Sequence, residues 1–359
     1  MLHGMKKLLL VASLFVAIDT RLFAQPDCKE YLKTPLPTEA SSVTAPTIWP
    51  DCDSPKLYSG IGVKADYAAA RKCAWAERMA IQADLQPKYT VASLYGGSAM
   101  LAVLYTNGEG VAQNKPLALR FGCEAGLNED GLKDIYALTD SPGGIGKKFN
   151  YCDYAFSTFE MNFCAAYEAE IAEQKRDDVF NSISSHWPKE LQAVFKLLRQ
   201  ANEAYVLSLG MDETYMGGTI RNLRSSGVEE DQRNKFLAAV KEFENGHLPQ
   251  GTASDFSKAD AELNRLYRKA IAAAKAPKEH EDDGDIKPEG IQRTERVWLK
   301  YRDTWVAFAK VHYPSTDSNA WLTLLTNERA TGLAMIICDT DEQDPACTPE
   351  IKRALEDQY

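Results

Sequence analysis

Beyond its first residues, the sequence has no apolar stretch long enough to cross a bilayer, which excludes internal membrane helices. It contains only five histidines and no Cys-x-x-Cys pair, so the usual zinc-ligand spacings are missing. It also lacks a basic excess, since its formal net charge is −10. Nucleic-acid phosphates require basic patches, so this charge argues against a nucleic-acid partner.

The one long apolar run lies at the N-terminus, over residues 8–18, directly after two lysines. A basic start, a short apolar run and a small residue at the cleavage point, here Ala24, are typical of a secretory signal peptide. The three residues before Cys28 lack the apolar character of a lipoprotein signal. We therefore predict a signal peptide over residues 1–24 and a periplasmic or secreted protein without a membrane span.

Cleavage of this signal peptide removes three basic side chains and one acidic one, so the mature chain carries a net charge of −12. This acidity has two interpretations. It can steer the protein toward a cationic partner at a rate that depends on ionic strength. Alternatively, it only keeps an exported protein soluble.

The chain contains eight cysteines, an even number that in an exported protein predicts four disulfides. Many pairings are possible in principle. The spacing and the repeat described next favour one set: Cys28–Cys52, Cys73–Cys123, Cys152–Cys164 and Cys338–Cys347.

An internal repeat follows an N-terminal arm, residues 25–54, that is rich in Pro, Thr and Ser. In both copies a Gly-x-Gly turn ends in Val, with Asp66 or Asn114 three residues later and Ala four further on. This pattern predicts two helices joined by a glycine turn, in which the Asp or Asn caps the second helix. Residues 55–130 resemble the Sel1-like repeat, a relative of the tetratricopeptide repeat. The resemblance implies a domain over residues 55–140 that uses stacked helix pairs for protein contacts.

Glycine and proline clusters divide the rest of the chain. Residues 141–146 form a predicted linker, Trp187-Pro188 a helix break, and residues 245–251 a second boundary. We expect helices over the segments between these points, which are residues 160–181, 191–205, 219–244 and the stretch that begins at Ser254.

The last predicted element is a helical hairpin over residues 291–335. Its apolar side chains step by three and four, which places them on one helical face. Pro314 ends the first helix, because proline lacks an N–H and crowds the preceding turn. These residue types favour a binding scaffold over a reaction centre.

Residues 150–248 and 252–348 are predicted to be diverged copies of one helical unit. The first copy carries Glu160-Met161-Asn162 and Cys164-Ala165, and the second carries Ala261, Leu263-Asn264, Tyr267, Trp298, Tyr301-Arg302-Asp303, Thr326, Arg329-Ala330 and Leu333. Through these motifs both copies resemble the lysozyme-inhibitor domain of the LprI type, a family of small exported bacterial helical domains. A cysteine that the family often carries is absent around Val306.

No nucleophile or acid/base set emerges, so we predict no enzyme activity, no catalytic residue, no cofactor and no metal. Trp298, Tyr301 and Trp305 are expected in the core, although a carbohydrate platform is the alternative. Arg302 and Arg329 are expected to pair with carboxylates between helices. The alternative is a paired-carboxylate acid/base site that includes Glu295, Arg296, Arg302, Asp303, Glu328 and Arg329. The acidic residues around His280 are expected to form a solvated insertion and not a calcium loop.

The sequence thus predicts an all-α, disulfide-linked exported protein that acts by binding another protein. The LprI resemblance implies a lysozyme-inhibitor-like function, and an acidic surface suits a basic muramidase. Two loops, Met211–Gly218 and Pro314–Asn319, are candidates to enter the cleft of such an enzyme. The alternative is a non-inhibitory cell-envelope scaffold that recruits partners through the Sel1-like repeats.

Overall fold

The computed structural model describes residues 28–42, 47–85, 94–140, 147–276 and 283–356, and every element in these residues is helical. The predicted all-α class is therefore confirmed. The elements are α1 (Cys28–Tyr31), the 3-10 helix η1 (Thr38–Ser42), α2 (Ser54–Ser59), α3 (Tyr67–Gln82), α5 (Ser98–Asn107), α6 (Lys115–Glu124), α7 (Glu129–Asp140), the 3-10 helix η2 (Tyr151–Tyr154), α8 (Thr158–Ser184), α9 (Lys189–Asp212), α10 (Arg221–Glu244), α11 (Ala253–Lys275), α12 (Pro288–His312), α13 (Ser318–Thr340) and α14 (Pro349–Glu356).

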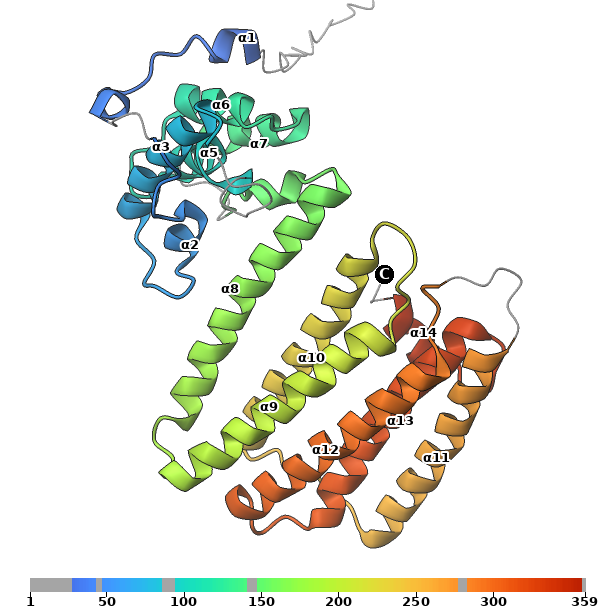
Figure 1. The fold of residues 1–359 in the computed structure, drawn as a ribbon. Coiled ribbons are helices and arrows are strands. Elements are labelled where there is room, and N and C mark those ends of the chain that lie inside the picture. The colour runs from blue at the N-terminus through green and yellow to red at the C-terminus, as the bar shows by residue number, and fades with distance from the viewer. Residues whose placement is uncertain (1–27, 43–46, 86–93, 141–146, 277–282, 357–359) are drawn as a thin grey trace, which may run out of the picture.

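Short helices form an N-terminal lobe (residues 28–154), long helices form a C-terminal bundle (residues 189–356), and α8 runs between them (Figure 1). The predicted signal peptide, the predicted linker over residues 141–146 and His280 lie outside the described residues.

Both predicted repeat turns have the expected helix–turn–helix form. Gly60 and Gly108 end α2 and α5 with positive φ angles of 78° and 69°, a conformation that glycine adopts without steric cost. Asp66 caps α3 by accepting a hydrogen bond from the Ala69 N–H, and Asn114 caps α6 in the same way. The Sel1-like assignment itself stays a resemblance, because it rests on this local pattern.

The core of the N-terminal lobe forms around α5. This helix is buried along nearly its whole length, since α3 packs on one side of it and α6 on the other. Trp75 and Tyr105 both contact the ring of Phe121, at centroid distances of 5.3 and 5.7 Å. A helix surrounded in this way must be apolar on every face, as the sequence of α5 is.

All eight cysteines form disulfides, but two of the four predicted pairs are wrong. Cys152–Cys164 and Cys338–Cys347 are confirmed. Cys28 bonds to Cys123 and Cys52 bonds to Cys73, in place of the expected Cys28–Cys52 and Cys73–Cys123.

The arm explains the Cys28 correction, because it crosses α6 and does not close on itself. The Arg120 guanidinium on α6 donates hydrogen bonds to the carbonyl oxygens of Leu32 and Thr34, which places Cys28 over this helix. Cys73 shares a face of α3 with Glu77, four residues later, and that face meets the segment around Ser54. Cys52 lies in this segment, which places it next to Cys73 and explains the bond between them.

Helix α8 starts with a capping box between Ser157 and Glu160 and contacts both parts of the molecule. In its first half, the Tyr167 hydroxyl donates to the Pro55 carbonyl oxygen of the lobe. In its second half, Arg176 pairs with Glu230 of α10 at 2.6 Å. Helix α8 is thus held by the lobe at one end and by the bundle at the other (Figure 1).

One hydrophobic core runs through α9 to α14 and includes the end of α8. The two predicted helical units therefore contribute to a single core. Its centre is aromatic, with Trp305 stacked on Trp321 at 5.8 Å. Helix α12 packs most extensively on α9, and α13 packs most extensively on α11. The predicted hairpin of α12 and α13 is thus present, but each of its helices is covered mainly by another element.

Candidate functional site: the C-terminal bundle

Arg329 is the most deeply buried charge of the bundle, with 1% of its surface exposed. Its terminal nitrogens donate to both carboxylate oxygens of Glu213, at 2.7 and 2.6 Å, and its Nε donates to Glu295 at 2.9 Å. Burial opposes the charge on Arg329, but the two carboxylates outweigh this effect and hold its pKa above the usual value. The cluster ties α13 to α12 and to the loop after α9.

The aromatic residues of the α12 motif lie in the core, and Arg302 lies beside them on the same helix. Trp298, Tyr301 and Trp305 are at most 4% exposed and belong to the core, so they present no carbohydrate platform on the surface. Arg302 does not bridge helices, contrary to expectation: it pairs with its neighbour Asp303 at 2.8 Å and lies over the Trp298 ring. Its guanidinium stays on α12 because the indole beside it offers a cation–π contact.

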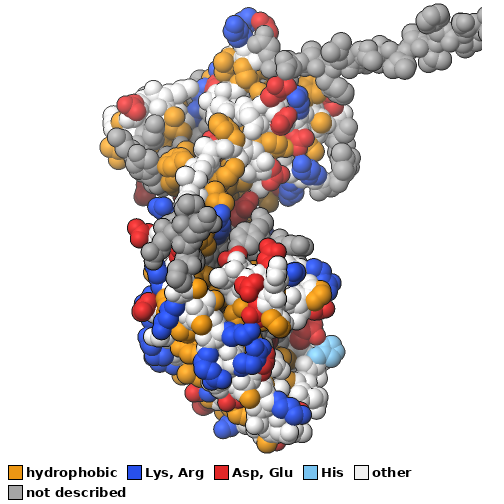
Figure 2. Space-filling model, turned by 90° about the vertical axis from the view of Figure 1, so that its right-hand side faces the viewer, with side chains coloured by type: hydrophobic (Ala, Val, Ile, Leu, Met, Phe, Trp, Pro, Cys, Tyr) orange, Lys and Arg blue, Asp and Glu red, His pale blue; other side chains and the backbone are white. Residues whose placement is uncertain are grey.

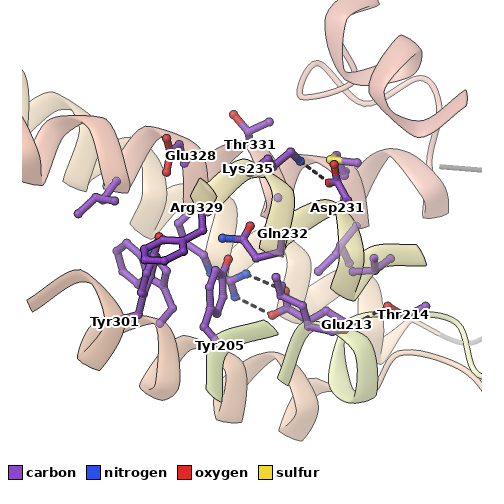
Figure 3. A pocket seen from close by; sticks show the side chains of 18 of the residues that line it. Tyr205, Glu213, Thr214, Asp231, Gln232, Lys235, Tyr301, Glu328, Arg329 and Thr331 are labelled. Atoms are coloured by element: carbon purple, nitrogen blue, oxygen red, sulfur yellow. Dashed lines mark hydrogen bonds and ion pairs between the residues drawn. The ribbon is translucent and has the colours of Figure 1, made fainter. Parts of the chain in front are cut away.

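A groove with a volume of about 500 Å³ lies between α10 and α13 (Figure 3). Aromatic side chains of α9 and α12 form its floor. Its size is within the range of ligand sites. The residues that line it include Tyr205, Leu209, Arg224, Val228, Asp231, Gln232, Lys235, Phe236, Ala239, Trp298, Tyr301, Trp305, Leu324, Glu328, Gly332, Met335 and Asp339.

Glu328 stands on the α13 wall of this groove and reaches solvent through it. Within the described parts of the chain its carboxylate has no hydrogen bond and no ion pair, and Lys235 on the facing wall pairs with Asp231 at 2.6 Å instead (Figure 3). Glu328 is exposed as a residue, but the groove walls around its carboxylate displace part of the water and raise its pKa to about 7, and Lys235 opposes this effect.

The two candidate loops lie at opposite ends of the bundle. The loop over residues 211–218 meets the start of α12, where Asp212 binds Arg293 at 2.6 Å. The loop over residues 314–319 follows the end of α12, where His312 binds Glu244 at 2.7 Å. The 25 residues of α12 span roughly 37 Å. The structure therefore does not bring the two loops together, and one enzyme cleft cannot receive both.

The surface charge is uneven. Basic side chains gather over the bundle face that carries α11, in spite of the acidic total (Figure 2). A basic partner is therefore not expected to dock there. The exposed basic residues of α11 are Lys258, Arg265, Arg268 and Lys275.

One group of potential metal ligands occurs in the described residues, and it lies in the N-terminal lobe. It consists of Cys52, Cys73 and Glu77. The two sulfur atoms are joined in a disulfide, and Glu77 already accepts hydrogen bonds from Ser54 and Gly97, so this group does not fit a metal ion.

Comparison with known proteins gives one match, to the family described as "Lysozyme inhibitor LprI", over residues 247–333. This part of the chain is similar to the LprI family. The match covers α11, α12 and most of α13, including Glu295 and Arg329. Curated proteins and solved structures give no match. The predicted first copy over residues 150–248 and the Sel1-like repeats are outside the matched segment.

Two further properties bear on location. None of the described helices is long and apolar enough to cross a membrane. The four disulfides fit an extracellular protein, because thiols stay reduced in the cytosol.

Sequence reasoning missed Glu213 and the whole α10 wall of the groove. Glu213 lies 116 residues from its partner Arg329, in a loop without any motif. The α10 wall carried no apolar periodicity that could have marked it, because its groove-lining positions include Asp231 and Lys235 beside Val228 and Ala239.

Proposed function

We propose that this is an exported bacterial protein that binds and inhibits a basic lysozyme-like muramidase. The observation that carries the proposal is the LprI match over residues 247–333, which coincides with three complete or nearly complete helices of the bundle. The disulfides and the net charge of −10 support it, because an acidic exported protein is attracted to a basic enzyme.

Of the two candidate loops, we assign the contact to residues 314–319. This loop lies inside the matched segment, whereas residues 211–218 lie outside it. Its Pro314, Ser315 and Asp317 are exposed, and Asp317 caps α13, so the loop is held on a rigid helix end. A pre-ordered loop loses little entropy when it enters a cleft.

The test is a cell-wall lysis assay in which the oxidised protein from residue 25 onward is titrated against lysozyme at low and moderate salt. Stoichiometric inhibition that weakens with salt is expected, because screening reduces charge attraction. If the lysozyme kept its full activity at a large excess of the protein, the proposal would be contradicted for that lysozyme.

Loop variants locate the contact. Replacing Ser315 and Asp317 with tryptophan and lysine should weaken inhibition at least about tenfold. The matched control replaces the exposed Met211, at the other end of the bundle, with lysine and should inhibit like the original protein. The reverse pattern would move the contact to residues 211–218.

A second function is favoured by a separate observation. The N-terminal lobe has its own core, and its first repeat turn exposes Val63 and Tyr67 (52% and 36%). An envelope scaffold would use this surface and would need no inhibition. Capture of an envelope protein by the full oxidised chain, lost in the Val63→Ser and Tyr67→Ser variant, would favour the scaffold.

A further inference from the structure

The groove between α10 and α13 has the shape of a binding site for a helix. Helix α10 packs on α8 and α9, and α13 packs on α11, α12 and α14, but α10 and α13 have no extensive contact with each other. Their walls are therefore separated, with α9 and α12 beneath them. Among the residues that the structure describes, no helix lies along this groove, and α14 reaches its lining through Leu355.

The length of the groove also matches a helix. Its lining residues on α13 run from Leu324 to Asp339, and those on α10 run from Arg224 to Phe243. At 1.5 Å per residue these walls extend over roughly 22 and 28 Å, which is four to five helical turns. A small ligand needs only part of this length.

The rim permits close approach of another backbone. Ala239 on α10 and Gly332 on α13 both line the groove. A Cβ atom built on Gly332 would meet only Arg329, at 4.0 Å, so the space above this glycine is open. Small residues at facing positions let two helices pack at short axial distance.

The groove combines apolar and charged side chains. Val228, Leu324 and Met335 are half-buried and contribute apolar surface, and the flexible thioether of Met335 adapts to varied partners. Arg329 is paired with two carboxylates and Lys235 with Asp231. Glu328 is exposed and has no ion-pair partner within the described ranges, so a positive charge on an occupant can pair with it.

We propose that the groove between α10 and α13 binds an amphipathic helix of a partner protein, which packs an apolar stripe against Val228, Leu324 and Met335 and directs one Lys or Arg to Glu328. In helix-in-groove recognition the bound helix presents apolar anchors spaced by three and four residues along one face. The site is independent of the proposed lysozyme contact at residues 314–319.

The test uses a defined probe, a helical peptide of about 18 residues with leucines along one face and a single lysine at its centre. The control peptide has the same sequence with norleucine in place of this lysine. Tryptophan fluorescence reports occupancy, because Trp298 and Trp305 form the floor. The lysine peptide should bind about tenfold or more tightly than the norleucine peptide. Glu328→Gln should abolish this preference, and Glu190→Gln, on an exposed residue outside the groove, should keep it.

A filling variant tests the location. Gly332→Leu should weaken the binding of both peptides at least about tenfold, since the leucine side chain would occupy part of the groove. Gly227→Leu is the matched control, because Gly227 lies on α10, is exposed, is outside the groove and has open space around it. It should bind like the original protein. Circular dichroism of both variants checks that they are folded.

Three results would overturn the proposal: no peptide binding, equal binding by Gly332→Leu and Gly227→Leu, or self-association of the protein that Gly332→Leu abolishes. The last would make a second copy of the chain the occupant. Peptide binding without any lysozyme inhibition would reject the proposed function and leave the helix site standing. Inhibition that is unchanged in a Gly332→Leu protein unable to bind peptide would show that the two sites are separate.

Discussion

The N-terminal lobe and the C-terminal bundle hold their helices together by different means. The lobe has short helices, and two disulfides lie within it while a third fastens it to α8; the longest, Cys28–Cys123, spans 95 residues of sequence. The bundle has one disulfide, Cys338–Cys347, which spans 9 residues. It is built instead on long helices, stacked tryptophans and the Arg329 cluster.

The difference follows from helix length. The longest helix of the lobe has 16 residues, and short helices are marginally stable by themselves, so they depend more on the links between them. The lobe should therefore respond strongly to loss of its disulfides, and the bundle to changes in its buried charges.

The largest expected effect is on the lobe. Replacing Cys28 and Cys123 with serine should lower the free energy of unfolding of the lobe by about 4–5 kcal/mol, because a long loop is released in the unfolded chain. The same change at Cys338 and Cys347 should cost the bundle about 2–3 kcal/mol, since its loop is short. Urea denaturation by tryptophan fluorescence measures both. If each pair of substitutions lowered a single shared transition, the lobe and the bundle would unfold as one unit.

The next effect tests the bundle. Arg329→Met leaves Glu213 and Glu295 without their partner and should cost about 3–5 kcal/mol. Arg302→Met is the control, because Arg302 makes a surface pair with the exposed Asp303 and a cation–π contact with Trp298, and it should cost about 1 kcal/mol. Chemical denaturation of the two variants gives the difference. Equal losses in the free energy of unfolding would mean that the buried Arg329 cluster stabilises the bundle no more than a surface ion pair does.

A smaller effect is expected from the buried carboxylate of the lobe. Glu77 accepts hydrogen bonds from the Ser54 N–H, the Ser54 hydroxyl and the Gly97 N–H. Glu77→Gln turns one acceptor into a donor that faces other donors and should cost about 1–3 kcal/mol. Glu170→Gln, which breaks only a surface pair with Lys56, should leave the denaturation midpoint nearly unchanged.

The smallest effect is a change in pH dependence. Because the pKa of Glu328 is about 7 in the folded protein against an ordinary value of 4.5, the folded state binds more protons between these two pH values. The contribution of Glu328 to the free energy of unfolding therefore falls as the pH rises through this window. The measurement is chemical denaturation at about pH 5 and pH 8. Between these pH values the free energy of unfolding should fall less in the Glu328→Gln variant than in the original protein, and in the Glu190→Gln variant it should fall as much as in the original protein. A decline of equal slope in both variants would place Glu328 in ordinary solvent.

The sequence by itself determined the all-helical class and several helix ends. Pro188 precedes α9, Gly60 and Gly108 end helices, and Asp66 and Asn114 begin them, because these signals act on the backbone within a few residues of themselves. The periodic apolar residues of α12 likewise identified its buried face in advance.

Only the tertiary structure decided which of these helices meet. It paired Cys28 with Cys123, joined Glu213 to Arg329 across 116 residues, and separated α10 from α13 to leave a groove. No local signal encodes such contacts, because they depend on how whole helix faces pack and on which polar groups must then find partners inside the core.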